Sequence, residues 1–259
     1  MSYENLIVEV DDPYLGAITL NRPEQLNTFT TPMAGELHRA LLELDGDDRV
    51  RVILIKGAGK AFCAGIDVHE LENKSAIEYK EWIERMERPL VAISQLNKPV
   101  IAQVQGVAAA NGMGLAVAAD LVIAADNAKM GLTAINVGLN CVGPVIPVAR
   151  IVGRKKALEL LLFGELIKAP EAMALGLVNR VVPKEELEQE TRAWAATLAR
   201  KSPLAVQIAK RAFYGSEDMD YLRQFDYMND AFARLCTTRD AKEGVAAFFE
   251  KRPPHWQGC

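Results

Sequence analysis

Short, continuously apolar runs alternate along most of this chain with longer segments whose apolar residues recur at helical spacing. The apolar runs predict strands, and those without polar positions indicate strands that are buried on both faces. Because these units recur through residues 1–180, we expect an α/β domain whose strands stack in successive turns. Strands are expected at residues 4–10, 15–20, 52–57, 98–104 and 121–124, with a turn at Asp11-Asp12-Pro13 after the first.

The segments between the strands predict helices. Thr30-Thr31-Pro32 begins one that continues to Leu44, since threonine caps helices and proline suits the first turn. Residues 70–87 are highly charged but keep a helical period. Residues 131–144 contain glycine and look irregular. Further helices are expected after the glycine turn at 106–114, near 145–152, and at 154–163 and 169–175.

The end of the chain differs from the rest in its predicted structure, because helical patterns follow one another there without strands between them. They cover residues 184–199, 202–214, 220–235 and 238–251. We therefore expect a core over 1–199 and an all-helical region over 200–259. An all-helical tail after an α/β body is typical of a lid or an oligomer contact, and this one has too little core of its own to form a second domain.

Composition narrows the function classes. A net charge of −4 and a pI near 5.6 argue against nucleic-acid binding through a basic surface. The four cysteines have no CxxC spacing, which fits neither a disulfide framework nor a zinc site. With three histidines a multi-histidine metal site is not expected. The first residues show no targeting signal and no apolar run is long enough for a bilayer, so we expect a metal-free cytoplasmic protein.

Two stretches of small residues, 60–67 and 105–114, carry the candidate chemistry. Each follows an apolar strand, and glycine or alanine there lets the backbone approach a ligand closely. Two such turns can direct two amide N–H groups at one point, which builds an oxyanion hole without side chains.

Seven motifs in order resemble the crotonase (enoyl-CoA hydratase/isomerase) superfamily over nearly the whole chain. They are Leu20-Asn21-Arg22-Pro23 with Leu26-Asn27, Phe62-Cys63-Ala64-Gly65-Ile66-Asp67, Lys98-Pro99-Val100-Ile101-Ala102 with Gly106, Ala119-Asp120-Leu121-Val122-Ile123-Ala124, Gly138-Leu139, Ala174-Leu175-Gly176-Leu177-Val178-Asn179, and residues 243–252.

The resemblance implies a crotonase-like spiral of ββα units, acyl-CoA thioester substrates, and a C-terminal helical region that assembles trimers or hexamers of two trimers. Coenzyme A would be part of the substrate, so no separate cofactor is expected. The shared chemistry stabilises a thioester enolate with two backbone amides, which by position are those of Ile66 and Asn111. The positions that match CoA-contacting residues are Gln25, Leu26, Ala64 and Asp67, with Phe232 and Lys251 from an adjacent subunit.

The acidic residues that this family uses are missing. Hydratases of the family carry two glutamates, at the positions that are Gly114 and Ala134 here. Isomerases and a dehalogenase carry an acid at the position of Val142. None of these three side chains can transfer a proton, so water addition assisted by two glutamates cannot be carried over.

Several residues could replace them. Cys141 lies beside the vacant acidic position, although an ordinary cysteine is mostly protonated at neutral pH. His69 titrates in a suitable range but follows the oxyanion turn. Asn111, Asn136 and Asn140 could line the pocket with amides, which orient substrates but shuttle protons poorly. The charged segment adds five glutamates that the sequence does not rank, namely Glu70, Glu72, Glu78, Glu81 and Glu84.

Three interpretations follow. The leading one is an acyl-CoA-processing enzyme of the hydratase/isomerase group. The second is a CoA-thioester decarboxylase, because residues 64–71 and 249–253 are similar to the methylmalonyl-CoA decarboxylase branch, whose histidine is replaced here by Ile66. The third is a catalytically silent CoA-binding protein. A nucleotide-dependent oxidoreductase is disfavoured because no GxGxxG follows a strand.

Overall fold

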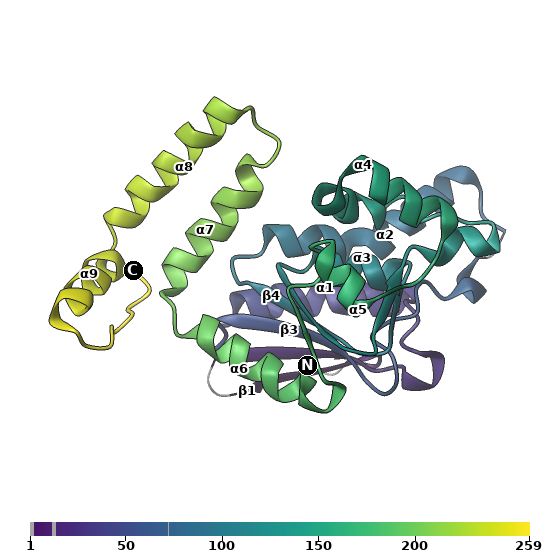
Figure 1. The fold of residues 1–259 in the computed structure, drawn as a ribbon, viewed down its shortest axis with the longest axis horizontal. Helices are drawn as coiled ribbons and strands as arrows, with labels where there is room; N and C mark the ends of the chain where they lie inside the picture. The colour runs from purple at the N-terminus through teal and green to yellow at the C-terminus, as the bar shows by residue number, and fades with distance from the viewer. Residues whose placement is uncertain (1–2, 12–13, 72) are drawn as a thin grey trace.

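The computed structural model describes residues 3–11, 14–71 and 73–259 (Figure 1). The turn expected at Asp11-Asp12-Pro13 lies largely outside the described residues, and so does Glu72. Among the described helices, none has both the length and the apolar character that crossing a membrane requires.

A six-stranded sheet forms the base of the fold, in the order β1-β2-β3-β4-β6-β9. The hairpin pair β1 and β2 is antiparallel, and every later pair is parallel. All five strands expected from the sequence are present, within two residues at each end. The bounds are β1 Leu6–Asp11, β2 Leu15–Leu20, β3 Val52–Gly57, β4 Val100–Val104, β6 Leu121–Ala125 and β9 Arg180–Val182.

A second, three-stranded sheet was not expected. It has the order β5-β7-β8, with β5 Val107–Ala109, β7 Lys129–Gly131 and β8 Ile167–Lys168. These strands are two or three residues long, which is too short to show a period of two in the sequence. Their position matters, because β5 forms part of the second small-residue turn.

Helices cover both faces of the large sheet. Gly16 of β2 is paired with Ile53 and contacts Leu44 of α1, whereas Lys56, which points to the other face, binds Glu188 of α6. The four residues that open β3 are therefore all buried. The helices of the body are α1 Thr31–Gly46, α2 Ala76–Gln95, α3 Asn111–Ala118, α4 Val145–Phe163, α5 Ala169–Ala174 and α6 Leu187–Ala199.

The helix expected over residues 70–87 needs correction. Residues 68–70 form a single 3-10 turn, and α2 begins only at Ala76, because Ser75 and Glu78 form a capping box there. Helix α2 then continues to Gln95, beyond the expected end at 87. The two helices expected at 145–152 and 154–163 are both present and together form α4, separated by the non-helical Gly153 with φ 73° and ψ 169°.

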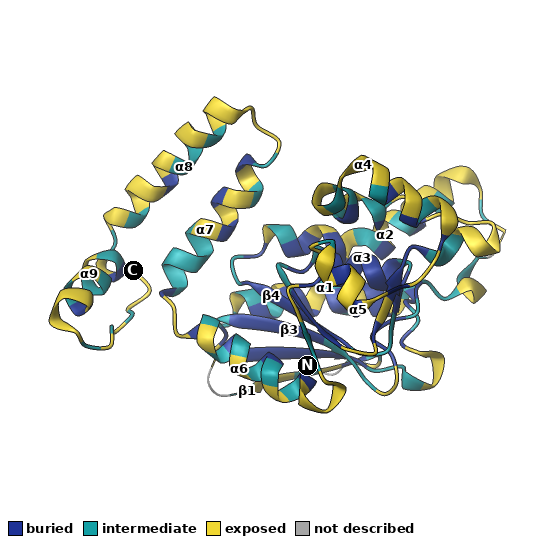
Figure 2. Cartoon of the chain, in the orientation of Figure 1, coloured by how far each residue is buried: buried dark blue, intermediate teal, exposed yellow. Residues whose placement is uncertain are grey.

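The last three helices form an arm that extends away from the body (Figure 1). They are α7 Pro203–Ser216, α8 Tyr221–Cys236 and α9 Arg239–Glu250, capped by Ser202, Asp220 and Thr238. Buried Lys210 of α7 ties the arm to the body through Asp120 at 2.6 Å. Much of α8 and α9 is exposed (Figure 2), and the exposed apolar side chains of the arm are Phe213, Met219, Tyr221, Leu222, Phe225, Phe232, Val245, Phe248 and Phe249.

Candidate active site

The two small-residue turns are held together by backbone hydrogen bonds. Phe62 N donates to Gln105 O at 2.9 Å, and Cys63 N donates to Val107 O at 3.1 Å. In the opposite direction, Ala109 N donates to Cys63 O at 2.9 Å. Since these residues follow β3 and β4, the turns meet at the carboxyl ends of adjacent parallel strands, which is where ligands bind in such sheets.

Past this ladder, the amides of Ile66 and Asn111 are left without acceptors. One neighbour of each is paired: Asp67 N donates to Phe29 O at 3.0 Å, and Ala110 N donates to Gly131 O at 2.8 Å. For Ile66 N and Asn111 N no acceptor is found in the described part of the chain. Asn111 is also the first residue of α3, so its free N–H lies at a helix N-terminus, which favours negative charge.

The residue before each of these amides has a positive φ, and the two residues touch. Gly65 has φ 105°, and a Cβ placed on it would lie 3.0 Å from Ala110 Cβ. Ala110 has φ 48° and ψ −115°, a conformation that costs a side-chain-bearing residue about 1–3 kcal/mol. The two turns thus contact each other at Gly65 and Ala110, the residues immediately before the unpaired amides.

The side chain of Asn111 is directed toward α2. Its Nδ2 donates to Met86 O at 3.5 Å, and its Oδ1 is buried without a partner within the described residues. Of the three asparagines expected to line the pocket, only Asn111 is buried. Asn136 donates instead to Gly164 O at 2.9 Å, and Asn140 is exposed.

The three positions where acids were expected carry the uncharged residues Gly114, Ala134 and Val142. Gly114 packs against Pro144 and Leu90, which would lie 2.9 and 3.0 Å from a Cβ placed there. Val142 is exposed, and Ala134 is partly buried. Cys141 is buried, and desolvation raises the pKa of its thiol, which reduces the thiolate fraction at neutral pH.

Other candidates from the charged segment serve the fold. The Glu70 carboxylate accepts hydrogen bonds from Thr31 N at 2.9 Å and Thr31 Oγ1 at 2.6 Å. Glu78 belongs to the capping box of α2, and Glu84 pairs with Lys80 on the exposed side of that helix. Glu81 is exposed. The ring of His69 is also exposed and binds Asp67 at 2.8 Å.

Glu87 was not among the candidates from the sequence, although it lies beside the loop that carries Val142. Its carboxylate lies against the backbone of Gly143, so that a methyl group on that glycine would overlap Oε1. Glu87 is half-buried, and burial followed by the charge of Glu84 raises the pKa of its carboxyl. The available signal was its spacing, four residues after Ile83 and three before Leu90, on the apolar side of α2.

The residues matched to CoA contacts occupy two places. Gln25, Leu26 and Ala64 lie on adjoining loops, with Ala64 N bonded to Leu26 O at 3.0 Å. Buried Asn27 fixes this region, because its Nδ2 donates to Ala58 O and Ala61 O at 2.9 and 2.8 Å. Asp67 is ionised in this setting, since hydrogen bonds from His69 and Arg22 lower the pKa of its carboxyl.

Phe232 and Lys251 lie elsewhere, on the arm. Phe232 is an exposed residue of α8, and Lys251 is the exposed left-handed residue that ends α9. Both helices lie beyond α7, away from α3 (Figure 1). Within one chain the structure therefore does not bring these two residues to the turns, so a role in CoA binding would require a neighbouring copy.

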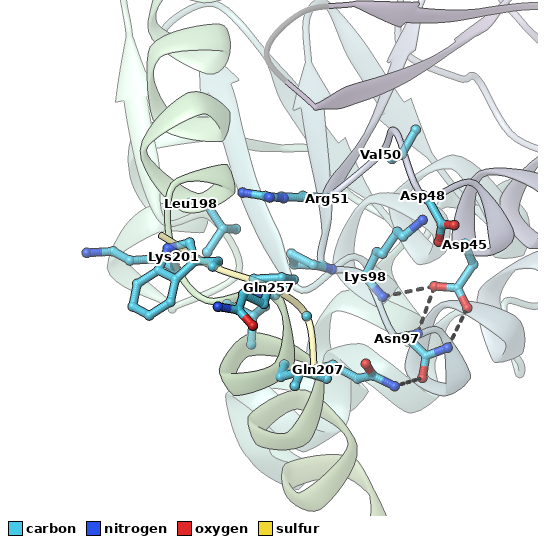
Figure 3. A pocket seen from close by; sticks show the side chains of 16 residues that line it. Asp45, Asp48, Val50, Arg51, Asn97, Lys98, Leu198, Lys201, Gln207 and Gln257 are labelled. Atoms are coloured by element: carbon cyan, nitrogen blue, oxygen red, sulfur yellow. Dashed lines mark hydrogen bonds between the residues drawn. The ribbon is translucent and has the colours of Figure 1, made fainter. Parts of the chain in front are cut away.

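A cavity of about 510 Å³ lies at the other end of the strands (Figure 3). It is bounded by Asn97 and Lys98, which precede β4, by α7, and by the C-terminal segment at Gln257. Its polar groups are engaged in structure: Asn97 binds Asp45 at 3.0 Å and Gln207 at 2.9 Å. The cavity joins the arm to the body and is separate from the turns that carry the free amides.

The chain is similar to known proteins over nearly its whole length. Residues 14–259 match the family described as enoyl-CoA hydratase/isomerase. The chain belongs to this family. It is 36% identical to a crotonyl-CoA hydratase of Syntrophomonas wolfei, covering 97% of each chain, and 34% identical to enoyl-CoA hydratase domain-containing protein 3 of Homo sapiens, covering 92% of this chain and 79% of the relative. A crystal structure of an enoyl-CoA hydratase from Mycobacterium smegmatis superposes with a TM-score of 0.94 at 37% identity, covering 98% of this chain and 99% of that one.

Membership confirms the fold and the class expected from the motifs. The chain has the crotonase fold, a mixed α/β architecture, and is an enzyme of the hydratase/isomerase group that processes acyl-CoA thioesters. Gly114, Ala134 and Val142, where the resemblance led us to expect acids in other members, carry no charge in this chain.

Proposed function

We propose that this enzyme forms a thioester enolate from an acyl-CoA substrate and stabilises it with the amides of Ile66 and Asn111, without two catalytic glutamates. The observation that carries the proposal is that these two N–H groups have no acceptor among the described residues, while Asp67 N and Ala110 N beside them are bonded. Unpaired backbone donors in a buried turn are rare, and a substrate oxygen would satisfy them.

The same turns explain how the enolate would be favoured over the ground state. The donors are held by backbone bonds and by the contact of Gly65 with Ala110, so little reorganisation is needed when charge develops on the oxygen. The N-terminus of α3 adds a favourable dipole at Asn111. One oxyanion donor is typically worth about 3–4 kcal/mol in the transition state.

Decarboxylation of a malonyl-type thioester is the second candidate. It is favoured by the neutral side chains at Gly114, Ala134 and Val142, because loss of carbon dioxide leaves an enolate without any base. A CoA-binding protein without chemistry is the third, and it predicts retention of the ligand without turnover.

We further propose how CoA is held. Gln25, Leu26, Ala64 and Asp67 would contact its adenine end, and Phe232 and Lys251 would reach it from a neighbouring subunit in a trimer or in a hexamer of two trimers. The exposed apolar side chains of α8 and α9 support such an assembly, since contiguous apolar surface favours association. Coenzyme A would enter the site as part of the substrate, so no separate cofactor is proposed. A cytoplasmic location fits the unpaired cysteines.

The test compares two substitutions at Asn111 on a panel of enoyl-, dienoyl- and malonyl-type CoA thioesters. Asn111→Gly keeps the N–H and should retain most turnover, whereas Asn111→Pro removes the donor and should lower turnover by about 10²–10³-fold. Thermal unfolding of both variants, with binding of CoA, separates loss of the donor from loss of the fold. Equal turnover of the two folded variants would contradict the proposal, and CoA binding without turnover by the wild type would favour the binding protein.

A further inference from the structure

The residue that moves the proton is unassigned at every position where the family pattern would place it. We infer that Glu87 of α2 is the general acid/base of this site, accepting and returning a proton at the α-carbon of the bound acyl group. The inference rests on the proposed function, because the enolate formed in this step needs the amides of Ile66 and Asn111.

The position of Glu87 is the first argument. Its carboxylate lies against Gly143, next to Val142, where an acid is expected and absent. The preceding residue, Met86, receives the hydrogen bond from the side chain of Asn111, so α2 passes directly beside the oxyanion turn. One turn further along α2, Leu90 contacts Gly114, the other vacant position. The carboxylate therefore enters the same region from a different element.

The lack of a partner is the second argument. Within the described residues the Glu87 carboxylate accepts no hydrogen bond and forms no ion pair, unlike Glu70 and Glu78 on the same segment. A half-buried carboxylate without a partner costs stability, and such groups are found where function requires them. Asn111 Oδ1 is a second unpartnered acceptor on this side of the site.

Access to solvent is the third argument. Glu87 also lines an open groove of about 390 Å³ beside α2, whose other charged or titratable members are His38 of α1 and Glu84 and Arg88 of α2. A proton taken up on the Gly143 side can thus leave to water on the groove side. Of the other elements around the site, the loop before α4 contributes the thiol of Cys141, and α3 contributes no titratable side chain.

The step balances without a further reactant. The bond between the α-carbon and its hydrogen breaks, and its electron pair forms the carbon–carbon double bond of the enolate while the carbonyl pair moves onto the thioester oxygen. The proton bonds to the Glu87 carboxylate. Return of the proton to the same carbon, or to another carbon of a conjugated chain, regenerates the carboxylate.

The experiment follows exchange of the α-hydrogens of butyryl-CoA in heavy water by mass spectrometry, which reports the step whatever the net reaction is. Glu87→Gln should slow exchange by about 10²–10⁴-fold, and Glu87→Asp should restore part of it. Glu81→Gln, at an exposed position of α2 that does not line the groove, is the matched control and should exchange like the wild type. Cys141→Ala should also keep most of its exchange.

The pH profile and thermal stability distinguish catalysis from a structural role. Only the ionised carboxylate accepts a proton, so wild-type exchange should rise with pH through the pKa of Glu87, and Glu87→Gln should lose this rise. Because burial raises the pKa of Glu87, its ionisation above that pKa costs folding stability. Glu87→Gln should therefore keep or raise the melting temperature at pH 8 while exchange is lost.

The outcomes separate this inference from the proposed function. Equal exchange by wild type and folded Glu87→Gln overturns the inference and leaves the oxyanion hole standing. Loss of exchange in Cys141→Ala with retention in Glu87→Gln assigns the proton to the thiol and also overturns it. No exchange by the wild type, with CoA bound, overturns both.

Discussion

The two sides of this site differ in the groups they present: backbone amides on the turn side and a side-chain carboxylate on the α2 side. On the turn side, backbone bonds between 62–63 and 105–109 hold the two turns together, and Cys63 is buried, which raises the pKa of its thiol to about 12. On the α2 side, a helix with one exposed face presents a half-buried carboxylate that nothing in the described structure binds. In the proposed mechanism, stabilisation of the enolate would therefore depend on rigid backbone, and proton transfer on a side chain from another element.

The largest expected effect comes from disturbing the rigid side. A methyl group on Gly112 would overlap Cys63 O, an atom that already accepts the bond from Ala109 N. Gly112→Ala must therefore push the two turns apart, with a loss of about 1–3 kcal/mol in the free energy of unfolding and of most turnover. Urea denaturation measures the first and the thioester panel the second.

The matched control is Gly35→Ala, where no atom lies within 4 Å of the added Cβ. Gly35 lies inside α1, so this change should stabilise the protein by about 0.5–1 kcal/mol and leave turnover unchanged. A Gly112→Ala protein as stable and active as Gly35→Ala would show that the turn side is not rigid.

A smaller effect is expected from displacing the α2 side alone. Gly143→Ala would overlap the Glu87 carboxylate, the end of a flexible side chain that can rotate into the groove. Turnover should fall by about 10²-fold, since a misplacement of this size moves a catalytic group out of reach. The melting temperature should change little, because Gly143 has no positive φ.

Gly46→Ala, at the exposed end of α1, controls for a glycine change without a neighbour. Combining Gly143→Ala with Glu87→Gln sharpens the comparison further. If both act through one carboxylate, the double variant should be no slower than Glu87→Gln alone. Additive losses would mean that Gly143 acts independently of Glu87.

Much of the fold follows from local patterns that tertiary contacts reinforce. Thr30 caps the helix it was expected to cap, and Ser202, Asp220 and Thr238 cap the helices of the arm, because a side-chain oxygen before an apolar repeat satisfies free N–H groups at the start of a helix. The two small-residue turns were also predicted from the sequence, because glycine and alanine directly after a buried strand let the backbone turn tightly and approach a ligand.

The remainder depends on contacts between distant segments. The three short strands exist only because β7 lies beside both β5 and β8, and no local period marks them. Glu87 was hidden among other glutamates, and its environment is set by Gly143, more than fifty residues away. The roles of Ile66, Asn111 and Cys141, and of the residues matched to CoA, stay predictions.

The most direct test of the central claim is a crystal structure with butyryl-CoA, whose saturated chain leaves the thioester intact. The account predicts a thioester oxygen about 2.7–3.2 Å from both Ile66 N and Asn111 N, with the α-carbon facing the Glu87 carboxylate. A thioester bound with its oxygen directed away from either amide would contradict it.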